Sequence, residues 1–468
     1  MASARMASAR RAVAGVVRHG GLVGVLIVGA VIRVAVGRTG VPSVYQDSLI
    51  YLRLSKNAPF TFSALRPNGY PVLIRVLSAG TANLRWMTDV QHVAGLVLGV
   101  LVYVLLVRLG TRRWLAAVAV AVVVIDAYGV ALETDVLSET FFTLTVTASV
   151  VLVAATGRGT PAVVTSGLLL ALAVVTRAVG IFAVPVWVAY VGLLGLGWRR
   201  SLVAVAAVVV PLLGYCTFHS VHGGSFALTD GDGWFLYAKV GPIADCSHAH
   251  VPPATLPLCH APTVSNPDFY LFSRASPAQQ LFFGPTGDVD VDTAITPASD
   301  RLLRDFSLGV IRAHPLAYTR MVSSDVAHYL GPKKAPVELS LYGSPGSLKN
   351  RYERYVHVPW WLIPAATAVA LAALVTGQAR RLEIALLAAM AWALLVGSSA
   401  TAGFNPRYTI PLVPLFVCAA ALSAEVLAAG ITHRRTPRPR SQPGEGSATP
   451  NVDEHEPGVG VNGAPQAL

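Results

Sequence analysis

The chain has 468 residues, of which 54% are hydrophobic and only 13% are charged, and its mean hydropathy is +0.57. Soluble domains carry about 25% charged residues, so this composition excludes a soluble enzyme, a disordered chain and a small disulfide-stapled protein. The formal net charge of +12 does not indicate a nucleic-acid partner, because the arginines collect at the ends of apolar blocks and no nucleic-acid-binding motif is present. The composition predicts an all-α polytopic membrane protein.

Ten apolar blocks approach the length needed to cross a bilayer core, which is about 20 residues. The fifth and sixth blocks form a short pair that is interrupted at Thr176 and Arg177, so the number of spans is predicted to within one or two. In chain order the blocks are 20–37, 89–108, 115–132, 138–156, 162–176, 179–197, 201–219, 357–377, 382–399 and 409–429.

The distribution of arginine predicts how these spans are oriented, since short cytoplasmic loops are rich in Arg and Lys. Placing the N-terminus in the cytoplasm puts every Arg-rich short loop, and the C-terminal tail, on that same side. We therefore expect an integral protein of the cytoplasmic (plasma) membrane. No convincing cleavage site follows the first block, which is interpreted as a retained span. The arginines that carry this prediction are Arg5, Arg10, Arg11, Arg18, Arg108, Arg112, Arg113, Arg158, Arg199, Arg200, Arg380, Arg381, Arg434, Arg435, Arg438 and Arg440.

The same spans predict the domain organisation. Two large connections face the outside, and a tail rich in Pro, Gly and Ser is expected to be disordered. The abundance of Ala, Val and Arg over Lys is typical of a GC-rich bacterial genome, which suggests a cell-envelope protein. The predicted regions are a cytoplasmic segment 1–19, a transmembrane core 20–219 with an outer loop 38–88, an extracytoplasmic region 220–356 of mixed structure, C-terminal helices 357–429 and the tail 430–468.

Ionisable residues at or inside a membrane are costly and often mark function, and here they collect at four places on the predicted outer face. The first is the loop 38–88, where Asp47 lies near aromatic residues and is a candidate general base. A solvated interfacial carboxylate is the alternative. Arg66 then opens a motif that predicts a rigid turn into an interfacial helix. The turn residues are Pro67, Gly69, Tyr70 and Pro71, with Asn68 between them.

The second place is the acidic segment between the third and fourth spans, which contains Glu133, Asp135 and Glu139. Three carboxylates in seven residues suit a divalent cation or the hydroxyls of a sugar. The alternative is capping of the fourth helix by Ser138 or Asp135. Asp126, inside the third span, is interpreted as a buried polar partner rather than a reactant.

The third and fourth places are single arginines, Arg177 between the fifth and sixth spans and Arg407 before the last span, where Tyr408 follows it. A lone Arg on the outer face is unfavourable under the positive-inside rule, so each one needs a reason. Binding a phosphate is one, since a guanidinium matches phosphate oxygens bidentately. Snorkelling to lipid headgroups is the other.

The long outer region 220–356 contains two cysteines that lie outside the predicted spans. A disulfide between Cys246 and Cys259 is the expected state outside the cytoplasm. A zinc site with His248, His250 and His260 is a weaker alternative, because no regular ligand spacing is present. The alternating Asp and Val of 288–292 suit an exposed strand or a cation-binding loop.

These residues together resemble the GT-C superfamily of integral membrane glycosyltransferases, in the branch of the family 39 protein mannosyltransferases and the lipid A aminoarabinose transferase. The resemblance covers residues 47–408. Two departures are that many relatives carry a paired acidic motif where this chain has Gln46-Asp47-Ser48, and Pro-Pro-Gly where it has Pro67-Asn68-Gly69. The matching residues are Asp47, the run Arg66 to Pro71, Ser138-Glu139, the run Leu172 to Gly180 that contains Thr176-Arg177, and Arg407-Tyr408.

The resemblance implies a sugar donor on a polyprenyl phosphate, consumed at the outer face of the lipid bilayer. Asp47 would deprotonate an acceptor hydroxyl, and a single displacement would invert the anomeric carbon. Arg66, Arg177 and Arg407 would neutralise the leaving phosphate, with Tyr408 beside them. Glu133, Asp135 or Glu139 would hold the acceptor or a divalent cation. The acceptor is a glycan, a lipid or a protein, and no certain cofactor is implied.

Two other classes of function compete with the enzyme. A polytopic transporter or lipid flippase predicts ionisable residues at the bilayer midplane and broken helices in paired repeats, and only Asp126 is a clear candidate in the middle of a span. A non-catalytic assembly factor would not need acids and arginines that face each other. The sequence therefore favours a hexosyl- or pentosyltransferase.

Overall fold

A computed structural model of the chain describes residues 19–39, 42, 44–78, 83–156, 159–260, 262–264, 267–284, 295–331, 358–377, 379–403 and 405–435. Within these ranges the chain is helical and contains no β-strand. The protein is an all-α membrane protein, as the composition predicts.

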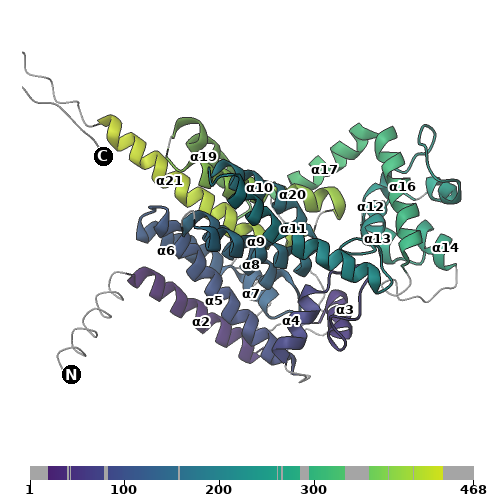
Figure 1. Ribbon diagram of the computed structural model, residues 1–468, viewed down its shortest axis with the longest axis horizontal. Coiled ribbons are helices and arrows are strands. Elements are labelled where there is room, and N and C mark those ends of the chain that lie inside the picture. Colours follow the sequence, from purple (N-terminus) through teal and green to yellow (C-terminus); the bar gives the residue numbers. More distant parts are fainter. Residues whose placement is uncertain are drawn as a thin grey trace, which may run out of the picture.

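Apolar helices form a bundle in which α2, α5, α6 and α21 run side by side (Figure 1). Each of the ten predicted spans overlaps one of these helices or a consecutive pair. The bundle consists of α2 (Gly20–Thr39), α5 (Leu84–Arg108), α6 (Arg113–Ile125), α7 (Ala127–Glu133), α8 (Glu139–Ala155), α9 (Thr160–Thr176), the 3-10 helix η1 (Ala178–Phe182), α10 (Ala183–Leu193), α11 (Trp198–Val221), α19 (Leu362–Thr376), α20 (Arg381–Thr401), the 3-10 helix η4 (Pro406–Leu412) and α21 (Val413–Arg435).

Length and apolarity identify which of the described helices can cross a bilayer. Five segments are long and apolar enough (α2, α5, α11, α20, and η4 continued by α21), and the bent pair α6–α7 would make a sixth. Four shorter apolar segments (α8, α9, η1–α10 and α19) account for the other predicted spans. The start of α2 and the end of α21 lie at the same end of the bundle (Figure 1), which an even number of crossings requires. The count of ten stays a prediction.

The predicted third span, 115–132, is not one continuous helix. It breaks at Asp126 into α6 and α7, which are bent by 52°. The Asp126 carboxylate accepts a hydrogen bond from the backbone N–H of Gly129 at 2.8 Å and another from the N–H of Val358 at 2.9 Å. Asp126 is 6% exposed and caps the first turn of α7, which confirms the interpretation of this residue as a buried polar partner; the expectation of one continuous span was wrong.

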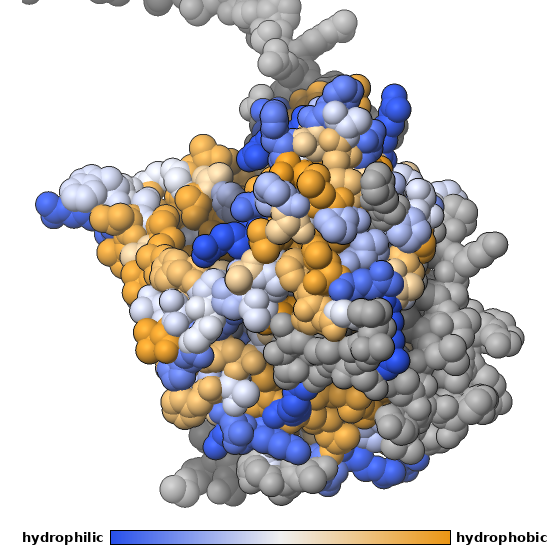
Figure 2. Space-filling view, turned by 90° about the vertical axis from the view of Figure 1, so that its right-hand side faces the viewer, coloured by the Kyte–Doolittle hydropathy of each residue, from blue (hydrophilic) through white to orange (hydrophobic). Residues whose placement is uncertain are grey.

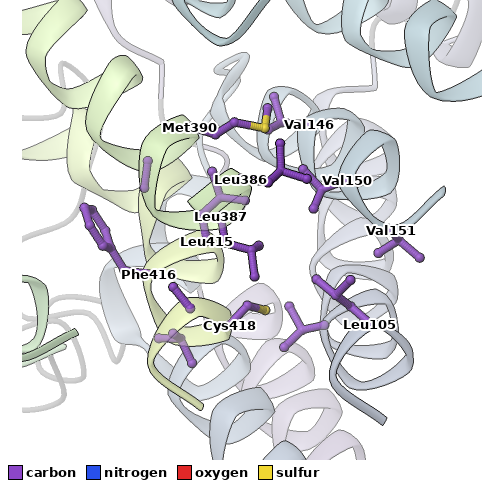
Figure 3. Close-up of a cluster of buried hydrophobic side chains, with 14 of the residues drawn as sticks. Leu105, Val146, Val150, Val151, Leu386, Leu387, Met390, Leu415, Phe416 and Cys418 are labelled. Atoms are coloured by element: carbon purple, nitrogen blue, oxygen red, sulfur yellow. The ribbon is translucent and has the colours of Figure 1, made fainter. Parts of the chain in front are cut away.

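The centre of the bundle is packed with aliphatic side chains from α5, α8, α20 and α21 (Figure 3). Leu105, Val150, Leu387 and Met390 have no exposed surface. Between helices in lipid, such packing supplies much of the association that the hydrophobic effect supplies in water. The result is a rigid frame whose loops at one end carry the polar residues.

Short helices gather at that end of the bundle (Figure 1), where Figure 2 shows hydrophilic and hydrophobic residues intermixed on the surface. The predicted outer loop 38–88 contributes α3 (Gln46–Ser55) and α4 (Gly69–Ser78). The region 220–356 contributes α12 (Asp232–Val240), η2 (Gly241–Ile243), η3 (Pro253–His260), α13 (Pro267–Phe272), α14 (Pro277–Phe283), α16 (Pro297–Ala313) and α17 (Pro315–Leu330).

The described part of region 220–356 is helical and has a hydrophobic core of its own, with Trp234, Tyr237 and Phe306 fully buried. Cys246 and Cys259 are joined by a disulfide, the pairing predicted from their position outside the spans. The Asp-Val repeat at 288–292 lies outside the described residues, as does the tail after 435. Helix α21 continues to its last residue, Arg435, so the first residues of the predicted tail 430–468 are helical.

Candidate active site

Asp47 lies in the first turn of α3, at the mouth of the helix bundle. Its carboxylate accepts a hydrogen bond from Arg66 Nη2 at 2.7 Å on one oxygen and from Arg407 Nη2 at 2.8 Å on the other. These arginines are 19 and 360 positions away along the chain. The fold therefore brings the first and last predicted motifs into direct contact.

A second carboxylate, Glu139, completes the arrangement from the first turn of α8. Its Oε1 lies 2.6 Å from Arg177 Nη1 and 3.6 Å from Arg407 Nε, so Arg407 sits between two acids. Three guanidinium groups against two carboxylates leave one net positive charge. We refer to these five residues, Asp47, Arg66, Glu139, Arg177 and Arg407, as the site cluster.

The predicted turn places Arg66 against the end of α9, where Arg177 follows. A side chain at Gly69 would overlap the carbonyl oxygen of Val175, so only glycine permits this approach. The Asn68 amide donates hydrogen bonds to the carbonyls of Pro59 and Thr61 at 2.9 and 2.8 Å, which ties the turn to the preceding loop. The motif predicted the turn, but nothing in it indicated that the Asn68 side chain makes the hydrogen bonds that hold it.

Arg177 is placed by the end of a helix and by an aromatic ring. It follows the last residue of α9 in an extended conformation, and its guanidinium lies 5.0 Å from the centre of the Tyr408 ring. Ser138 Oγ lies 3.5 Å from Arg177 Nη1 and 3.2 Å from Tyr51 Oη. Ser138 makes no side-chain cap hydrogen bond to α8. Its hydroxyl therefore does not cap the fourth predicted span, which was the alternative role.

The charges around Asp47 determine its protonation. Burial disfavours the carboxylate, but attraction to Arg66 and Arg407 and their hydrogen bonds outweigh it and hold the pKa of Asp47 well below its usual range. Burial also opposes the charged form of Arg66, and Asp47 outweighs it and raises the pKa of that guanidinium. While both arginines face Asp47, the carboxylate is a weak base.

The site cluster borders a cavity of about 520 Å³, here called the site cavity. Four members of the cluster (Asp47, Arg66, Arg177 and Arg407) and Tyr408 line its polar part. Another part is lined by apolar side chains of η1, α20 and η4, among them Val179, Phe182, Leu394 and Leu412. A cavity with this division can hold a phosphate group and part of the hydrocarbon attached to it.

Three further residues in the site cavity come from the region 220–356 and were missed by the sequence analysis. Asp232 at the start of α12 and Arg304 of α16 line the cavity, and the Phe235 ring lies 5.3 Å from the Arg66 guanidinium carbon. Asp232 also accepts a hydrogen bond from Thr229 Oγ1 at 3.0 Å. No motif marks these residues, because they follow more than 160 positions after Arg66 in a segment without a recognisable pattern.

Two of the three predicted acids do not join the site cluster. Glu133 pairs with Arg33 at 2.6 Å and with His92 Nδ1 at 2.8 Å, on the other side of the turn between α7 and α8. We refer to Arg33, His92 and Glu133 as the anchor cluster. The Asp135 side chain is buried and does not line the site cavity.

The anchor cluster contains a residue that the sequence analysis overlooked. Arg33 lies inside the first predicted span, 20–37, and is 4% exposed. A side chain at Gly95 of α5 would overlap the Glu133 carboxylate, so this glycine makes the room for the pair. Among the residues that the structure describes, no group of three or more His, Cys, Asp or Glu side chains is placed to hold a metal ion.

No protein-family model and no curated protein sequence matches the chain significantly. Several solved structures do. One is the Saccharomyces cerevisiae protein O-mannosyltransferase Pmt1-Pmt2 complex bound to the sugar donor, with 18% identity and a TM-score of 0.36 over 47% of this chain and 36% of that one. Another is the oligosaccharyltransferase AglB of Archaeoglobus fulgidus in complex with an inhibitory peptide and a dolichol-phosphate, with 14% identity and a TM-score of 0.40 over 90% and 52%.

A third similar structure is ArnT of Cupriavidus metallidurans bound to undecaprenyl phosphate, with 16% identity and a TM-score of 0.35 over 88% of this chain and 78% of that one. The chain spans about a third to a half of the length of the first two proteins. The three names are those of glycosyltransferases, the class to which the motif resemblance pointed. At these scores the assignment of the site depends on its own geometry.

Proposed function

We propose that the chain is a membrane glycosyltransferase that moves a sugar from a polyprenyl-phosphate donor to an acceptor hydroxyl, with inversion at the anomeric carbon. The observation that carries the proposal is one carboxylate, Asp47, held between Arg66 and Arg407 in a cavity that is partly polar and partly apolar. The positive-inside rule assigns this end of the bundle to the extracytoplasmic face.

The charge of the site cluster matches that of the donor. A sugar joined to a polyprenyl phosphate is a phosphodiester with one negative charge, and the cluster carries one net positive charge. Binding the donor therefore brings the site to neutrality. Guanidinium groups suit this role because they pair with phosphate oxygens in a fixed fork geometry.

The transfer preserves that neutrality. Asp47 takes the proton of the acceptor hydroxyl, whose oxygen forms a bond to the anomeric carbon on the side opposite the phosphate. The bond between that carbon and the phosphate oxygen breaks, and its electron pair stays with the phosphate. The phosphate gains one negative charge as Asp47 loses one, so the arginines face a constant total charge while the new charge develops beside them.

The donor also activates the base in this proposal. The phosphate competes with Asp47 for the N–H groups of Arg66 and Arg407. Each hydrogen bond that an arginine donates to the phosphate instead of to Asp47 reduces the stabilisation of the carboxylate. The pKa of Asp47 then rises toward its usual range, and its basicity with it. An acceptor that arrives without a donor meets a carboxylate that is already engaged.

The remaining residues are assigned supporting roles. Glu139 is a positioning residue that holds Arg177 and Arg407, and Tyr408 supports both guanidinium groups with its ring. Asp232 and Arg304 are suited to contact the acceptor, which is a glycan, a lipid or a protein, and the sugar is a hexose or a pentose. The displacement needs no cofactor, because the arginines supply the positive charge that a divalent cation would otherwise supply.

Replacing Asp47 by Asn tests the proposal in two opposite directions. We expect transfer from a polyprenyl phosphate carrying a radiolabelled hexose or pentose to fall by about 10²- to 10⁴-fold, the usual contribution of a general base. Binding of polyprenyl phosphate itself should be unchanged or tighter, because the competing carboxylate is gone. Equilibrium binding to the purified protein in detergent measures the second effect.

The matched control is Asp305→Asn, which removes an exposed carboxylate from α16 and should change neither quantity. An Asp47→Asn protein that keeps full transfer would show that Asp47 is not the base. A parallel loss of transfer and of polyprenyl phosphate binding would assign Asp47 a structural role instead.

A further inference from the structure

A second cavity of about 490 Å³ lies between α2 and α5, near the end of the bundle that carries α3 and α4. Its lining includes Arg38 in the last turn of α2 and Arg85 and Asp89 in the first two turns of α5. It includes none of the residues of the site cluster, and we refer to it as the α2–α5 cavity. The ends of spanning helices lie at the depth of lipid headgroups.

Four charged side chains line this cavity, and only one of them, Arg33, is paired with a described residue, Glu133. The side chains of Arg38, Arg85 and Asp89 are exposed and make no hydrogen bond or ion pair with any part of the chain that the structure describes. With Arg33 neutralised by Glu133, the two remaining guanidinium groups and one carboxylate leave one net positive charge. Apolar side chains of Val34, Val93 and Leu96 complete the lining, so the cavity offers charge at its mouth and hydrocarbon along its wall.

A buried imidazole in the wall gives the cavity its specificity. His92 is only 7% exposed, and its Nδ1 lies 2.8 Å from a Glu133 oxygen. A carboxylate only accepts hydrogen bonds, so Nδ1 carries the proton, and in that tautomer Nε2 is an acceptor. Within the described ranges Nε2 is buried without a hydrogen-bond partner, and Gly37 of α2 faces it without a side chain to cover it.

An unsatisfied buried acceptor is costly unless a ligand or water completes it. A bound group with a hydroxyl would donate to Nε2, and the Asp89 carboxylate offers a second acceptor nearby in the lining. The guanidinium groups of Arg38 and Arg85 are suited to bind a phosphate group. The cavity therefore presents two donors of positive charge, two acceptors and an apolar wall.

We propose that the α2–α5 cavity binds a phospholipid whose headgroup carries both a phosphate and free hydroxyls, as in phosphatidylglycerol. The phosphodiester neutralises the excess charge of Arg38 and Arg85, the headgroup hydroxyls donate to His92 and Asp89, and an acyl chain lies against Val34 and Val93. Basic pockets between spanning helices are suited to anionic headgroups. The proposal stands on its own residues and does not depend on the transferase assignment.

The test uses the purified full-length protein, delipidated in detergent and titrated with single lipids under native mass spectrometry. We expect phosphatidylglycerol to bind more tightly than phosphatidylcholine. The double variant Arg38→Gln/Arg85→Gln should lose roughly tenfold or more of that affinity, because two charge-assisted contacts disappear. The control Arg108→Gln removes an exposed arginine from the other end of α5 and should bind as the wild type does.

A second variant tests the role of His92 without removing the contact to Glu133. In His92→Asn the side-chain amide can still donate to the carboxylate, but the shorter side chain places no acceptor at the position of Nε2. This variant should bind phosphatidylglycerol more weakly and phosphatidylmethanol, a phosphodiester whose headgroup has no hydroxyl, as well as the wild type does. Equal losses for both lipids would overturn the assignment of His92 to a hydroxyl.

Two further outcomes would overturn the proposal as a whole. One is an unchanged affinity for phosphatidylglycerol in the Arg38→Gln/Arg85→Gln protein. The other is displacement of the lipid by millimolar inorganic phosphate, which would make the apolar wall irrelevant. Polyprenyl phosphate should not compete for this cavity, so failure here and failure of the proposed transferase site give different results.

Discussion

The anchor cluster and the site cluster use the same chemistry, buried arginines paired with carboxylates, in opposite ways. All three nitrogens of Arg33 are engaged: two bind Glu133 at 2.8 and 2.6 Å, and the third donates to the carbonyls of Gly29 and Val124. The arginines of the site cluster make fewer protein hydrogen bonds and border the site cavity, with 12–15% of each side chain exposed against 4% for Arg33. The two clusters lie on either side of the short turn between α7 and α8.

The difference shows how one kind of interaction serves two purposes. A buried pair whose nitrogens all contact protein oxygens holds helices together, and losing one partner leaves a buried charge. A pair that faces a cavity can exchange a protein carboxylate for a ligand phosphate, because both supply the same oxygen acceptors. The number of protein partners around each arginine separates an anchor from a binding site.

The largest effect should come from breaking the anchor cluster. In Glu133→Gln the buried Arg33 loses its counter-charge, and we expect the free energy of unfolding to fall by about 3–5 kcal/mol. Thermal unfolding in detergent measures it. The double variant Arg33→Met/Glu133→Met should recover much of the loss, since it leaves no unpaired charge. A Glu133→Gln protein as stable as the wild type would remove the distinction between the clusters.

A smaller effect, on activity and not on stability, is expected for Arg407→Lys. Lysine keeps the charge but cannot span Asp47 and Glu139 with one planar group. We expect kcat/KM for transfer to fall by roughly 10- to 100-fold, with the unfolding temperature nearly unchanged. Arg320→Lys, at an exposed position on α17, is the matched control. A change in stability as large as that of Glu133→Gln would make the site cluster a second anchor.

The smallest effect is the pH dependence that Asp47 adds to stability. Its pKa is lower in the folded protein than the value of about 3.9 in an unfolded chain. The pairing therefore stabilises the fold fully above about pH 4 and is lost as the pH falls toward the folded pKa. The difference in unfolding temperature between the wild type and Asp47→Asn should shrink below about pH 4. A constant difference from pH 7 to pH 3 would contradict this.

The main members of the site could be predicted from the sequence because a charged side chain at a membrane boundary is energetically costly. Asp47, Arg66, Arg177 and Arg407 are charged residues at membrane boundaries, and such residues persist only where something requires them. The overlap of the ten apolar blocks with the helices has a similar origin, since hydropathy over a whole block averages out local irregularity.

The features that could not be predicted are the directions in which side chains point and their partners far away along the chain. Glu133 and Glu139 are six positions apart, and the turn between them points one toward Arg33 and the other toward Arg177. Arg33 was hidden because a single charge in the apolar block 20–37 barely changes its mean hydropathy. Asp126 could be interpreted as buried, but its second partner, the N–H of Val358, is 232 positions away along the chain. Asp232 joins the site only through the folding of the outer region.

The contact between Asp47 and Arg407 joins residues that are synthesised 360 positions apart. A chain inserted into the membrane only as far as α20 already contains Asp47, Arg66, Glu139 and Arg177, but it lacks the guanidinium that grips the second oxygen of Asp47. The pocket is finished only after η4, which carries Arg407, takes its place beside α3. It is therefore one of the later parts of the described fold to be completed, and a chain terminated before Arg407 cannot present a competent site.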